Sequence, residues 1–406
     1  MKYNVLIVYA YTRYLERTAV YRHLYAFREY SEHNAFYLNI EDMPAPEYLR
    51  DAGIDLILFH NTLLATRWNS DRFHRLMERC SVFRDYDAVK GIMPQDEYFR
   101  AKQLCRFMKN TGTTKVFTLA KPETAMGIYR DMHLPIEAYH QVLTGYVDPE
   151  LKDKAHKKDI KRDIDIGYRA WKPEYWLGSH AQLKYQAGEV FRSYSDSLKL
   201  DISSRPEDVL KGLSWHEFLK RCRYMPGVEG GASILDYDGS LMKECTKYME
   251  RHPEASFAEA EGLLFPGRDG EIEYFALSPR QFECIQAGAC QVLIEGDYNG
   301  VLEKGKHYIE LRKDFSNIDD VVRILHDEEM RKSVALKAYE DVIASDKYTY
   351  AALTEAVVNS ALGGKKPFGC SKTKKYLEKN RTRDSLYWIK QFFVARSPLL
   401  RRILYG

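Results

Sequence analysis

The chain has 406 residues, of which 45% are hydrophobic and 29% are charged, and its formal net charge is +3 at pH 7. This length suffices for two domains with separate cores, and this composition excludes an intrinsically disordered chain. The seven cysteines are an odd number and include no C-x-x-C spacing, so neither a disulfide framework nor a zinc site is expected. We expect reduced thiols in the cytoplasm, no signal peptide before the first strand and no membrane-spanning segment.

Strands and helices alternate over the first 120 residues. The apolar runs predict strands at 4–10, 35–40, 54–60, 88–93 and 115–120, with helices at 18–30, 70–80 and 96–110. Such alternation indicates a doubly wound parallel sheet. No glycine-rich turn follows the first strand, where Tyr11 and Arg13 stand instead, and this argues against a nicotinamide cofactor.

Ligands of such sheets bind beyond the carboxyl ends of the strands. Asp96, which follows the fourth strand, is the first candidate for a general base, and His60, at the end of the third strand, is the second. Each has a plainer interpretation. Asp96 would serve as a helix N-cap with Glu97 in the first turn, and His60 would be a satisfied histidine at the sheet edge.

The segment 148–162 is rich in Lys and Asp and nearly free of apolar residues, so we interpret it as the linker between two domains. The alternation then resumes with strands at 163–169, 198–202 and 223–228 and helices at 179–193 and 215–221. A loop containing Gly230 and Gly231 follows, and two glycines after a strand allow a ligand to approach the backbone closely.

The most completely specified helix start is at residue 278. Ser278 is placed as N-cap, Pro279 at the first helical position, and Gln281 where it completes a capping box. The free N–H groups of a helix start attract anions. With the guanidinium of Arg280 beside it and Glu283 one turn on, this start suggests a site for a phosphate and a ribose diol.

The surrounding sequence resembles the C-terminal domain of bacterial GT-B glycosyltransferases, and within them the glycosyl transferases group 1 and CgeB-like set. The resemblance covers roughly residues 163–356 and is specific in 278–317. The residues that carry it are Ser278, Pro279, Arg280, Phe282, Glu283, Gly288, Glu295, Gly296, Tyr298, Gly300, His307, Tyr308, Ile309 and the run 313–317.

The resemblance implies two Rossmann-like doubly wound domains facing a cleft, with the acceptor on the first and the donor on the second. The residues that it and the helix start indicate for donor binding are Arg169, Lys184, Glu229, Gly230, Gly231, Ser233, Ser278, Arg280 and Glu283. Arg169 and Lys184 would hold a diphosphate, and each could instead belong to a solvated face. Retaining members carry E-x7-E across this helix. Here Phe275 takes the place of the first glutamate, so the stereochemical course is not carried over.

Asp236 and Asp238 form an isolated D-x-D that a turn explains equally well. We do not expect a metal, because GT-B sites place cationic side chains and helix ends where other transferases place one. No cofactor is expected beyond the nucleotide sugar, which is the donor substrate.

The last 42 residues differ from the rest of the chain. Residues 365–406 contain twelve Lys and Arg against Glu378 and Asp384, a net charge of +10, which leaves −7 for the other 364 residues. Aromatic residues such as Trp388 are interleaved with the basic ones, which suits an anionic membrane surface. The alternatives are a terminal helix that packs on the first domain, or a mixture of both. No nucleic-acid recognition module is present.

The sequence therefore predicts an acceptor-side domain at 1–157, a nucleotide-sugar domain at 158–364 and a basic amphipathic tail at 365–406. The predicted function is metal-independent transfer of a hexosyl-type group to a glycan or glycolipid acceptor in cell-surface polysaccharide assembly. The expected location is the cytoplasm or the inner face of the cell membrane. The competing interpretation is a non-catalytic protein of the same fold that binds a sugar nucleotide or serves as a scaffold.

Overall fold

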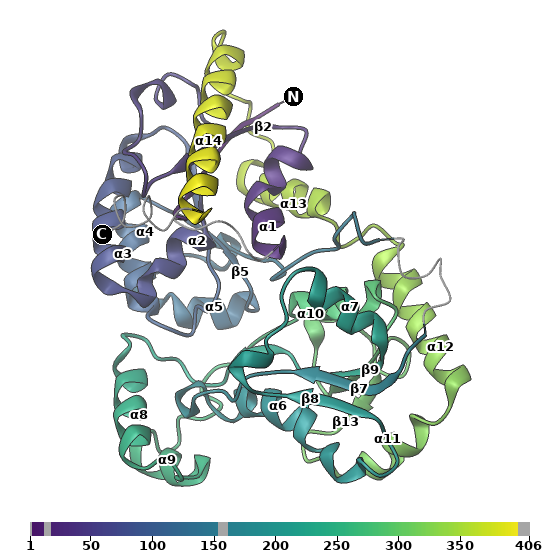
Figure 1. Cartoon of the computed structure of the whole chain (residues 1–406). Coiled ribbons are helices and arrows are strands. Elements are labelled where there is room, and N and C mark those ends of the chain that lie inside the picture. Colours follow the sequence, from purple (N-terminus) through teal and green to yellow (C-terminus); the bar gives the residue numbers. More distant parts are fainter. Residues whose placement is uncertain (1, 12–17, 153–160, 397–406) are drawn as a thin grey trace. The chain divides into compact units, whose positions relative to one another are not determined.

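A computed structural model of the chain describes residues 2–11, 18–152 and 161–396 (Figure 1). Its contacts divide the chain into two compact units. Unit 1 comprises Met1–Val142 and Leu353–Gly406, and unit 2 comprises Leu143–Ala352. The boundary that we expected at 157 and 158 lies outside the described residues, and the one expected at 364 and 365 lies within unit 1.

Unit 1 contains a six-stranded sheet among its described residues, with the order β2-β1-β3-β4-β5-β6 and every pairing parallel. The strands are β1 (Asn4–Tyr9), β2 (Asn34–Asn39), β3 (Leu56–His60), β4 (Val89–Met93), β5 (Lys115–Thr118) and β6 (Tyr139–Gln141). The helices are α1 (Thr18–Glu29), α2 (Asn61–Leu64), α3 (Ser70–Cys80), α4 (Ala101–Thr111), α5 (Pro122–Ile128), most of α13 (Tyr350–Leu362) and α14 (Thr373–Arg396).

Unit 2 contains a five-stranded parallel sheet in its described part, with the order β13-β12-β9-β7-β8. The strands are β7 (Ile164–Arg169), β8 (Leu200–Ser203), β9 (Cys222–Gly227), β12 (Cys290–Ile294) and β13 (Ile309–Leu311), and β10 (Gly230–Ala232) pairs antiparallel with β11 (Tyr274–Ala276). The helices are α6 (Ser179–Glu189), α7 (Leu213–Arg221), α8 (Ser240–Arg251), α9 (Phe257–Leu264), α10 (Pro279–Gln286), α11 (Ile318–Ile324) and α12 (Glu328–Ala338).

Both main sheets have the same winding. The second strand of each unit lies outside the first, and the third lies on the first strand's other side. The chain therefore reverses its direction of winding between β1 and β3 in unit 1 and between β7 and β9 in unit 2, and such switch points are where doubly wound sheets bind ligands. The expected α/β fold of two Rossmann-like doubly wound domains is confirmed.

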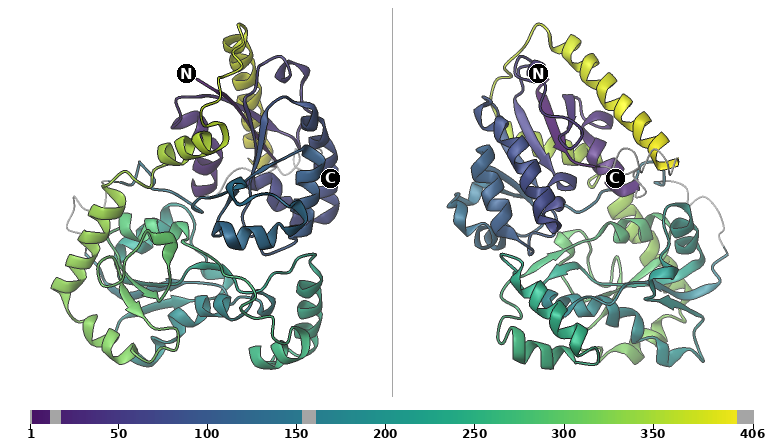
Figure 2. Two further views of the ribbon diagram at one scale, coloured as in Figure 1. Left: turned by 180° about the vertical axis from the view of Figure 1, so that it is seen from behind. Right: turned by 60° about the vertical axis from the view of Figure 1, so that its left-hand side comes forward.

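The structure differs locally from the predictions at α4 and at elements that were not predicted, among them α5 and β6. The helix expected from residue 96 begins at Ala101, because Asp96 and Arg100 have positive φ angles of 53° and 50° that an α-helix cannot contain. The pair α8–α9 was not predicted, and it stands to one side of the unit 2 sheet (Figures 1 and 2).

The basic tail forms α14, which runs alongside the edge strand β2 (Figures 1 and 2). The Asn380 amide accepts a hydrogen bond from the backbone N–H of Tyr37 at 2.8 Å and donates one to the Tyr37 carbonyl at 2.9 Å. Asn380 thus offers β2 the bonds that a further strand would offer, and α14 covers an edge that is otherwise open to pairing. The tail residues Arg401 and Arg402 lie outside the described residues.

Candidate functional site

The first turn of α10 has the expected capping arrangement. The side-chain oxygen of Gln281 accepts hydrogen bonds from the Ser278 N–H at 3.0 Å and from the Ser278 hydroxyl at 2.6 Å. The amide nitrogen of the same glutamine donates to the carbonyl of Val228 at 3.4 Å. Since Val228 directly follows β9, this bond fixes the start of α10 beside the carboxyl end of a central strand.

Arg280 projects from this turn as a half-buried cation between two aromatic rings. Its guanidinium carbon lies 5.4 Å from the ring centre of Tyr168 and 5.3 Å from that of Trp215, both within the range of a cation–π contact. No carboxylate in the described part of the chain forms an ion pair with it. The charge of Arg280 is therefore held in place by rings and remains available to an anion.

Glu283 has a protein partner already. Its Oε2 accepts a hydrogen bond from the indole N–H of Trp215 at 2.8 Å, so Trp215 connects Arg280 and Glu283. Sequence reasoning missed Trp215, because nothing in the sequence relates α7 to a helix more than sixty residues further on. The predicted ribose contact of Glu283 stays a prediction, and this bond orients the carboxylate that would make it.

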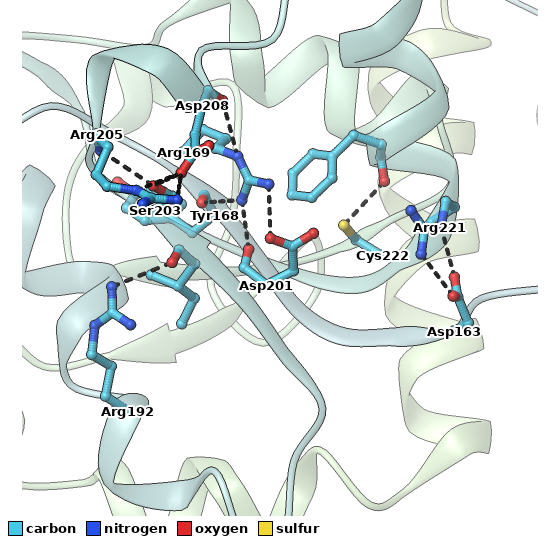
Figure 3. Close-up of polar contacts among 12 residues, drawn as sticks. Asp163, Tyr168, Arg169, Arg192, Asp201, Ser203, Arg205, Asp208, Arg221 and Cys222 are labelled. Carbon is cyan, nitrogen blue, oxygen red and sulfur yellow. Dashed lines mark hydrogen bonds and ion pairs between the residues drawn. The ribbon is translucent and has the colours of Figure 1, made fainter.

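Arg169, which we expected to hold a diphosphate, is bonded to protein through all three of its guanidinium nitrogens (Figure 3). They donate to the carbonyls of Tyr168, Asp201 and Asp208 and, at 2.7 Å, to the Asp201 carboxylate. The guanidinium also lies 4.4 Å from the ring centre of Phe218. The structure thus gives Arg169 the role of joining β7 to β8 rather than that of a cation awaiting a ligand.

Lys184, the other candidate for the diphosphate, lies on α6. Its ammonium nitrogen is 5.6 Å from the ring centre of Trp171, and its backbone carbonyl accepts a hydrogen bond from the Tyr168 hydroxyl at 2.7 Å. The Trp171 side chain is one of the exposed large apolar groups of unit 2 and directly follows the first residue beyond β7. Lys184 is therefore near the carboxyl edge of the sheet, beside an exposed ring.

The glycine loop after β9 is built into the fold. Gly230 and Gly231 belong to β10, and a Cβ at Gly231 would lie 1.8 Å from the carbonyl oxygen of Tyr274, so only glycine fits there. Glu229 is buried and accepts the backbone N–H of Tyr298 at 2.7 Å; burial is the main reason that its pKa is raised. The Ser233 hydroxyl donates to Asp269 at 2.6 Å. These side chains hold loops together.

The N-terminus of α6 is also already satisfied. Asp269 accepts the backbone N–H of Ser179 at 2.9 Å, the role that a phosphate plays at many helix starts. Burial tends to raise the pKa of Asp269, and its bonds to Ser179 and Ser233 outweigh that effect and lower it. Compared with the start of α6, the start of α10 is therefore the better anion site.

Two further residues of this edge were absent from our list of donor contacts. His180, in the first turn of α6, is buried, stacks on Phe275 with ring centres 3.6 Å apart, and lies 3.2 Å from the Glu229 carbonyl through Nε2. Lys313 is exposed just beyond β13. Burial is the main reason that the pKa of His180 is lowered, and the charge of Lys313 adds to that effect, whereas at Glu229 the same charge opposes the larger effect of burial, which raises the pKa. The position of Lys313 after a strand would have identified it.

In unit 1, Asp96 is half-buried in a loop whose backbone is bound by the side chain of Arg67. The fully buried guanidinium of Arg67 donates to the carbonyls of Leu64, Gln95, Asp96 and Phe99. The Asp96 carboxylate accepts the Tyr98 hydroxyl at 3.0 Å. Asp96 is not the N-cap of α4, which begins five residues later. The alternative role as a helix cap is thus wrong, and Asp96 stays a candidate base.

His60 is a buried histidine whose contacts favour the plainer interpretation. Its Nε2 lies 2.8 Å from Nδ1 of His23, and its Nδ1 accepts the backbone N–H of Thr62 at 3.2 Å. Burial, with a smaller contribution from His23, lowers the pKa of His60 well below its ordinary value. His60 caps α2 and is too enclosed to reach a substrate hydroxyl in this conformation. Arg13, which follows the first strand in the sequence, lies outside the described residues.

The two aspartates of the D-x-D sequence accept hydrogen bonds from backbone N–H groups around the start of α8. Asp236 is buried and accepts the N–H groups of Gly239, Leu241 and Met242, and Asp238 accepts that of Ser240. Burial is the main reason that the pKa of Asp236 is raised, against the effect of these bonds. This is the turn that we kept as the alternative to a metal site.

No protein-family model matches the chain, and no curated protein matches it in sequence. Solved structures do resemble it over most of its length. HepE of Anabaena in complex with UDP-glucose is 8% identical, with a TM-score of 0.46 over 88% of this chain and 98% of that one. An α-glucosyltransferase in complex with UDP and DNA is 11% identical, with a TM-score of 0.47 over 89% and 100% of the two chains. AviGT4, a glycosyltransferase involved in avilamycin A biosynthesis, is 9% identical, with a TM-score of 0.43 over 88% and 97%.

Proposed function

We propose that this protein transfers a glycosyl group from a nucleotide sugar to an acceptor hydroxyl, with the donor bound on unit 2. The observation that carries the proposal is Arg280, a half-buried guanidinium at a capped helix start, flanked by two rings and paired with no carboxylate of the described chain. Sites for phosphate groups combine these two features, a helix N-terminus and an arginine fork.

In this reaction the bond between the sugar and the diphosphate breaks, and negative charge grows on the leaving oxygen. Arg280, the start of α10 and Lys313 are the groups of unit 2 that would stabilise that charge. Lys184 is a further candidate. Arg169 is left out, because its nitrogens are bonded to β7, β8 and the Asp208 carbonyl. The Trp215 indole would keep the Glu283 carboxylate in the orientation that a ribose diol requires.

We assign the acceptor to unit 1, with Asp96 as the general base that takes the proton of the acceptor hydroxyl. Asp96 lies just beyond β4 in a left-handed conformation, which is uncommon for a residue other than glycine and occurs often at functional sites. The carbonyl bonds of Arg67 on either side would hold it in that conformation. The proposed reaction needs no metal and no cofactor, because cationic side chains do the work of a cation on the diphosphate.

The acceptor class that we propose is a glycan or glycolipid, and the exposed side of α14 supports work at an anionic membrane surface. Among residues 372–390, for which the structure describes the side chains, the exposed basic residues are Lys372, Lys374, Lys375, Lys379, Arg381 and Lys390. Leu386 and Ile389 stand among them with 59% and 52% of their surface exposed. Basic charge beside apolar side chains is the composition of surface-binding helices. No helix in the described residues is both long and apolar enough to cross a membrane.

The alternative is a protein that binds a sugar nucleotide without turning it over. Phe275 favours it, because a phenyl ring stacked on His180 stands where retaining relatives carry a glutamate. Hydrolysis or transfer of a radiolabelled sugar from UDP- and GDP-sugars separates the two functions.

The donor site itself is tested by Arg280→Ala. Loss of a charge-assisted bond to the diphosphate should weaken nucleoside diphosphate binding by about 1.5–3 kcal/mol, or roughly ten- to a hundredfold. Glu283→Gln should weaken a nucleoside more than it weakens inorganic phosphate, and the exposed Arg251→Ala serves as a control for charge alone. A folded Arg280→Ala protein with unchanged affinity would exclude this site.

A further inference from the structure

Unit 1 has a cavity of about 580 Å³ at the edge of its sheet where the strands begin. Residues at or just before the starts of β1, β3, β4 and β5 line one side, and the last turn of α13 and the connector after it line the other. Asp96 and His60 lie at the opposite, carboxyl edge of the same sheet. The cavity is therefore separate from the acceptor candidates, and the proposed function does not use it.

The lining of this cavity is predominantly cationic. Lys90, Lys115, Lys365 and Lys366 line it, with Asp55 and Asp87 as the carboxylates. Both oxygens of Asp55 are bonded to the chain, one to the N–H of Asn4 and the other to that of Phe368, each at 2.7 Å. The end of α13 adds only a partial negative charge of about half an elementary charge. Four ammonium groups outweigh these opposing charges.

Lys90 is the most enclosed of the four, with 8% of its surface exposed. Its ammonium donates to the carbonyls of Tyr86 at 2.7 Å and Ala88 at 3.2 Å. No carboxylate of the described chain pairs with it, and burial lowers its pKa, although Asp87 and Asp85 act in the opposite direction. A buried ammonium that lacks an acidic partner is stabilised by any anion that enters beside it.

The other three lysines are also without an ion pair among the residues that the structure describes. Lys115 donates to the Glu137 carbonyl at 3.2 Å, and Lys365 and Lys366 are exposed at the mouth. Neutral polar groups of Thr114, Asn359 and Ser360 also line the cavity. Hydroxyl and amide groups of this kind bind the hydroxyls of a sugar, while lysines bind phosphate as point charges.

We propose that this cavity is a second ligand site, which binds a small phosphorylated sugar. Its volume lies in the range of small-molecule sites, about 300–1,000 Å³. The phosphate would lie against Lys90 and Lys115, with Lys365 and Lys366 closing over it from the connector. The competing explanation is that the two connector lysines only complement the end of α13.

The test uses the full chain carrying Arg280→Ala, so that the proposed donor site does not contribute, and ribose 5-phosphate as the titrant in calorimetry. A triple variant with Lys115→Gln, Lys365→Gln and Lys366→Gln should bind ribose 5-phosphate about tenfold or more weakly, because it loses charge-assisted contacts to the phosphate. Lys372→Gln, Lys374→Gln and Lys375→Gln make the same change in charge on exposed residues of unit 1 that do not line the cavity, and they should leave the affinity unchanged.

Circular dichroism of both triple variants confirms that they fold. The absence of any ribose 5-phosphate binding by the Arg280→Ala chain would overturn the proposal. Equal losses in the two triple variants would overturn it as well, since they would indicate nonspecific attraction. Free ribose should not bind. If inorganic phosphate bound as tightly as ribose 5-phosphate, the sugar part of the proposal would be wrong.

Discussion

The docking of the basic tail depends on one buried carboxylate, and Asp384→Ala tests it. Asp384 accepts the hydroxyls of Tyr9 at 2.7 Å and Tyr25 at 3.0 Å and pairs with Arg28 at 2.8 Å. Two other guanidinium nitrogens of Arg28 are buried and have no hydrogen-bond partner, so Asp384 is the acceptor on which this arginine relies. Arg28 also lies over the rings of Tyr25 and Tyr37.

The expected cost follows from what the substitution leaves behind. Removing Asp384 would strand a partly buried guanidinium and deprive two buried hydroxyls of their acceptor. Breaking a buried pair in this way costs about 3–5 kcal/mol. The matched control is Asp42→Ala. It removes a carboxylate that pairs, at 3.3 Å, with the ammonium of Lys390, a more exposed residue of the same helix. Such a surface pair contributes about 0.2–1 kcal/mol.

Amide hydrogen exchange measured on peptides from α14 reports the free energy of opening this helix, and the measurement does not require unit 2 to unfold. Asp384→Ala should raise the opening of α14 by roughly a hundredfold or more, and Asp42→Ala by less than about tenfold. Exchange from α14 that is equally slow in both variants would refute the reasoning. It would mean that packing of Tyr387 and Trp388, rather than the buried charge, holds the helix. Deleting the chain after Asn380 should likewise destabilise unit 1, because α14 packs along β2.

Three further outcomes are expected at other places in the chain. A triple variant with Lys374→Glu, Lys375→Glu and Arg381→Glu should bind vesicles of anionic lipid at least tenfold more weakly, since each basic residue contributes about 1 kcal/mol. Hydrogen exchange from α14 should be unchanged in this variant. If the full-length protein does not bind such vesicles at low salt, the membrane role is excluded. Burial lowers the pKa of His23 to about 4, so between that value and about 6.5 the unfolded chain binds a proton that the folded chain does not. Stability present above about pH 6.5 should therefore be lost as the pH falls, by about 2 kcal/mol from His23 alone at about pH 5, and a urea midpoint of unit 1 that does not change with pH would contradict this. Sugar transfer should persist in chelator, whereas loss with rescue by magnesium or manganese would make Asp236 and Asp238 ligands.

Local sequence determined the elements and the clearest site. Runs of apolar residues identified most strands of both sheets, since a parallel strand covered on both faces must be apolar throughout. The three-residue edge strand β6 was missed. The start of α10 was equally readable, because Ser278, Pro279 and Gln281 act on one another within a single turn. Arg280 belongs to that turn, and its position needed no knowledge of the fold.

Only the tertiary structure decided which charged groups are available to a ligand. Arg169 ends β7 and Arg280 lies in the first turn of α10. Asp201 from the neighbouring strand pairs with Arg169, whereas no carboxylate of the described chain pairs with Arg280. Asp384 meets Tyr9 across 375 residues, and Asp269 meets the start of α6 across 90. A side chain's partners at such separations are set by how the strands are ordered and the helices packed, and a pattern that extends over a few turns carries no information about them.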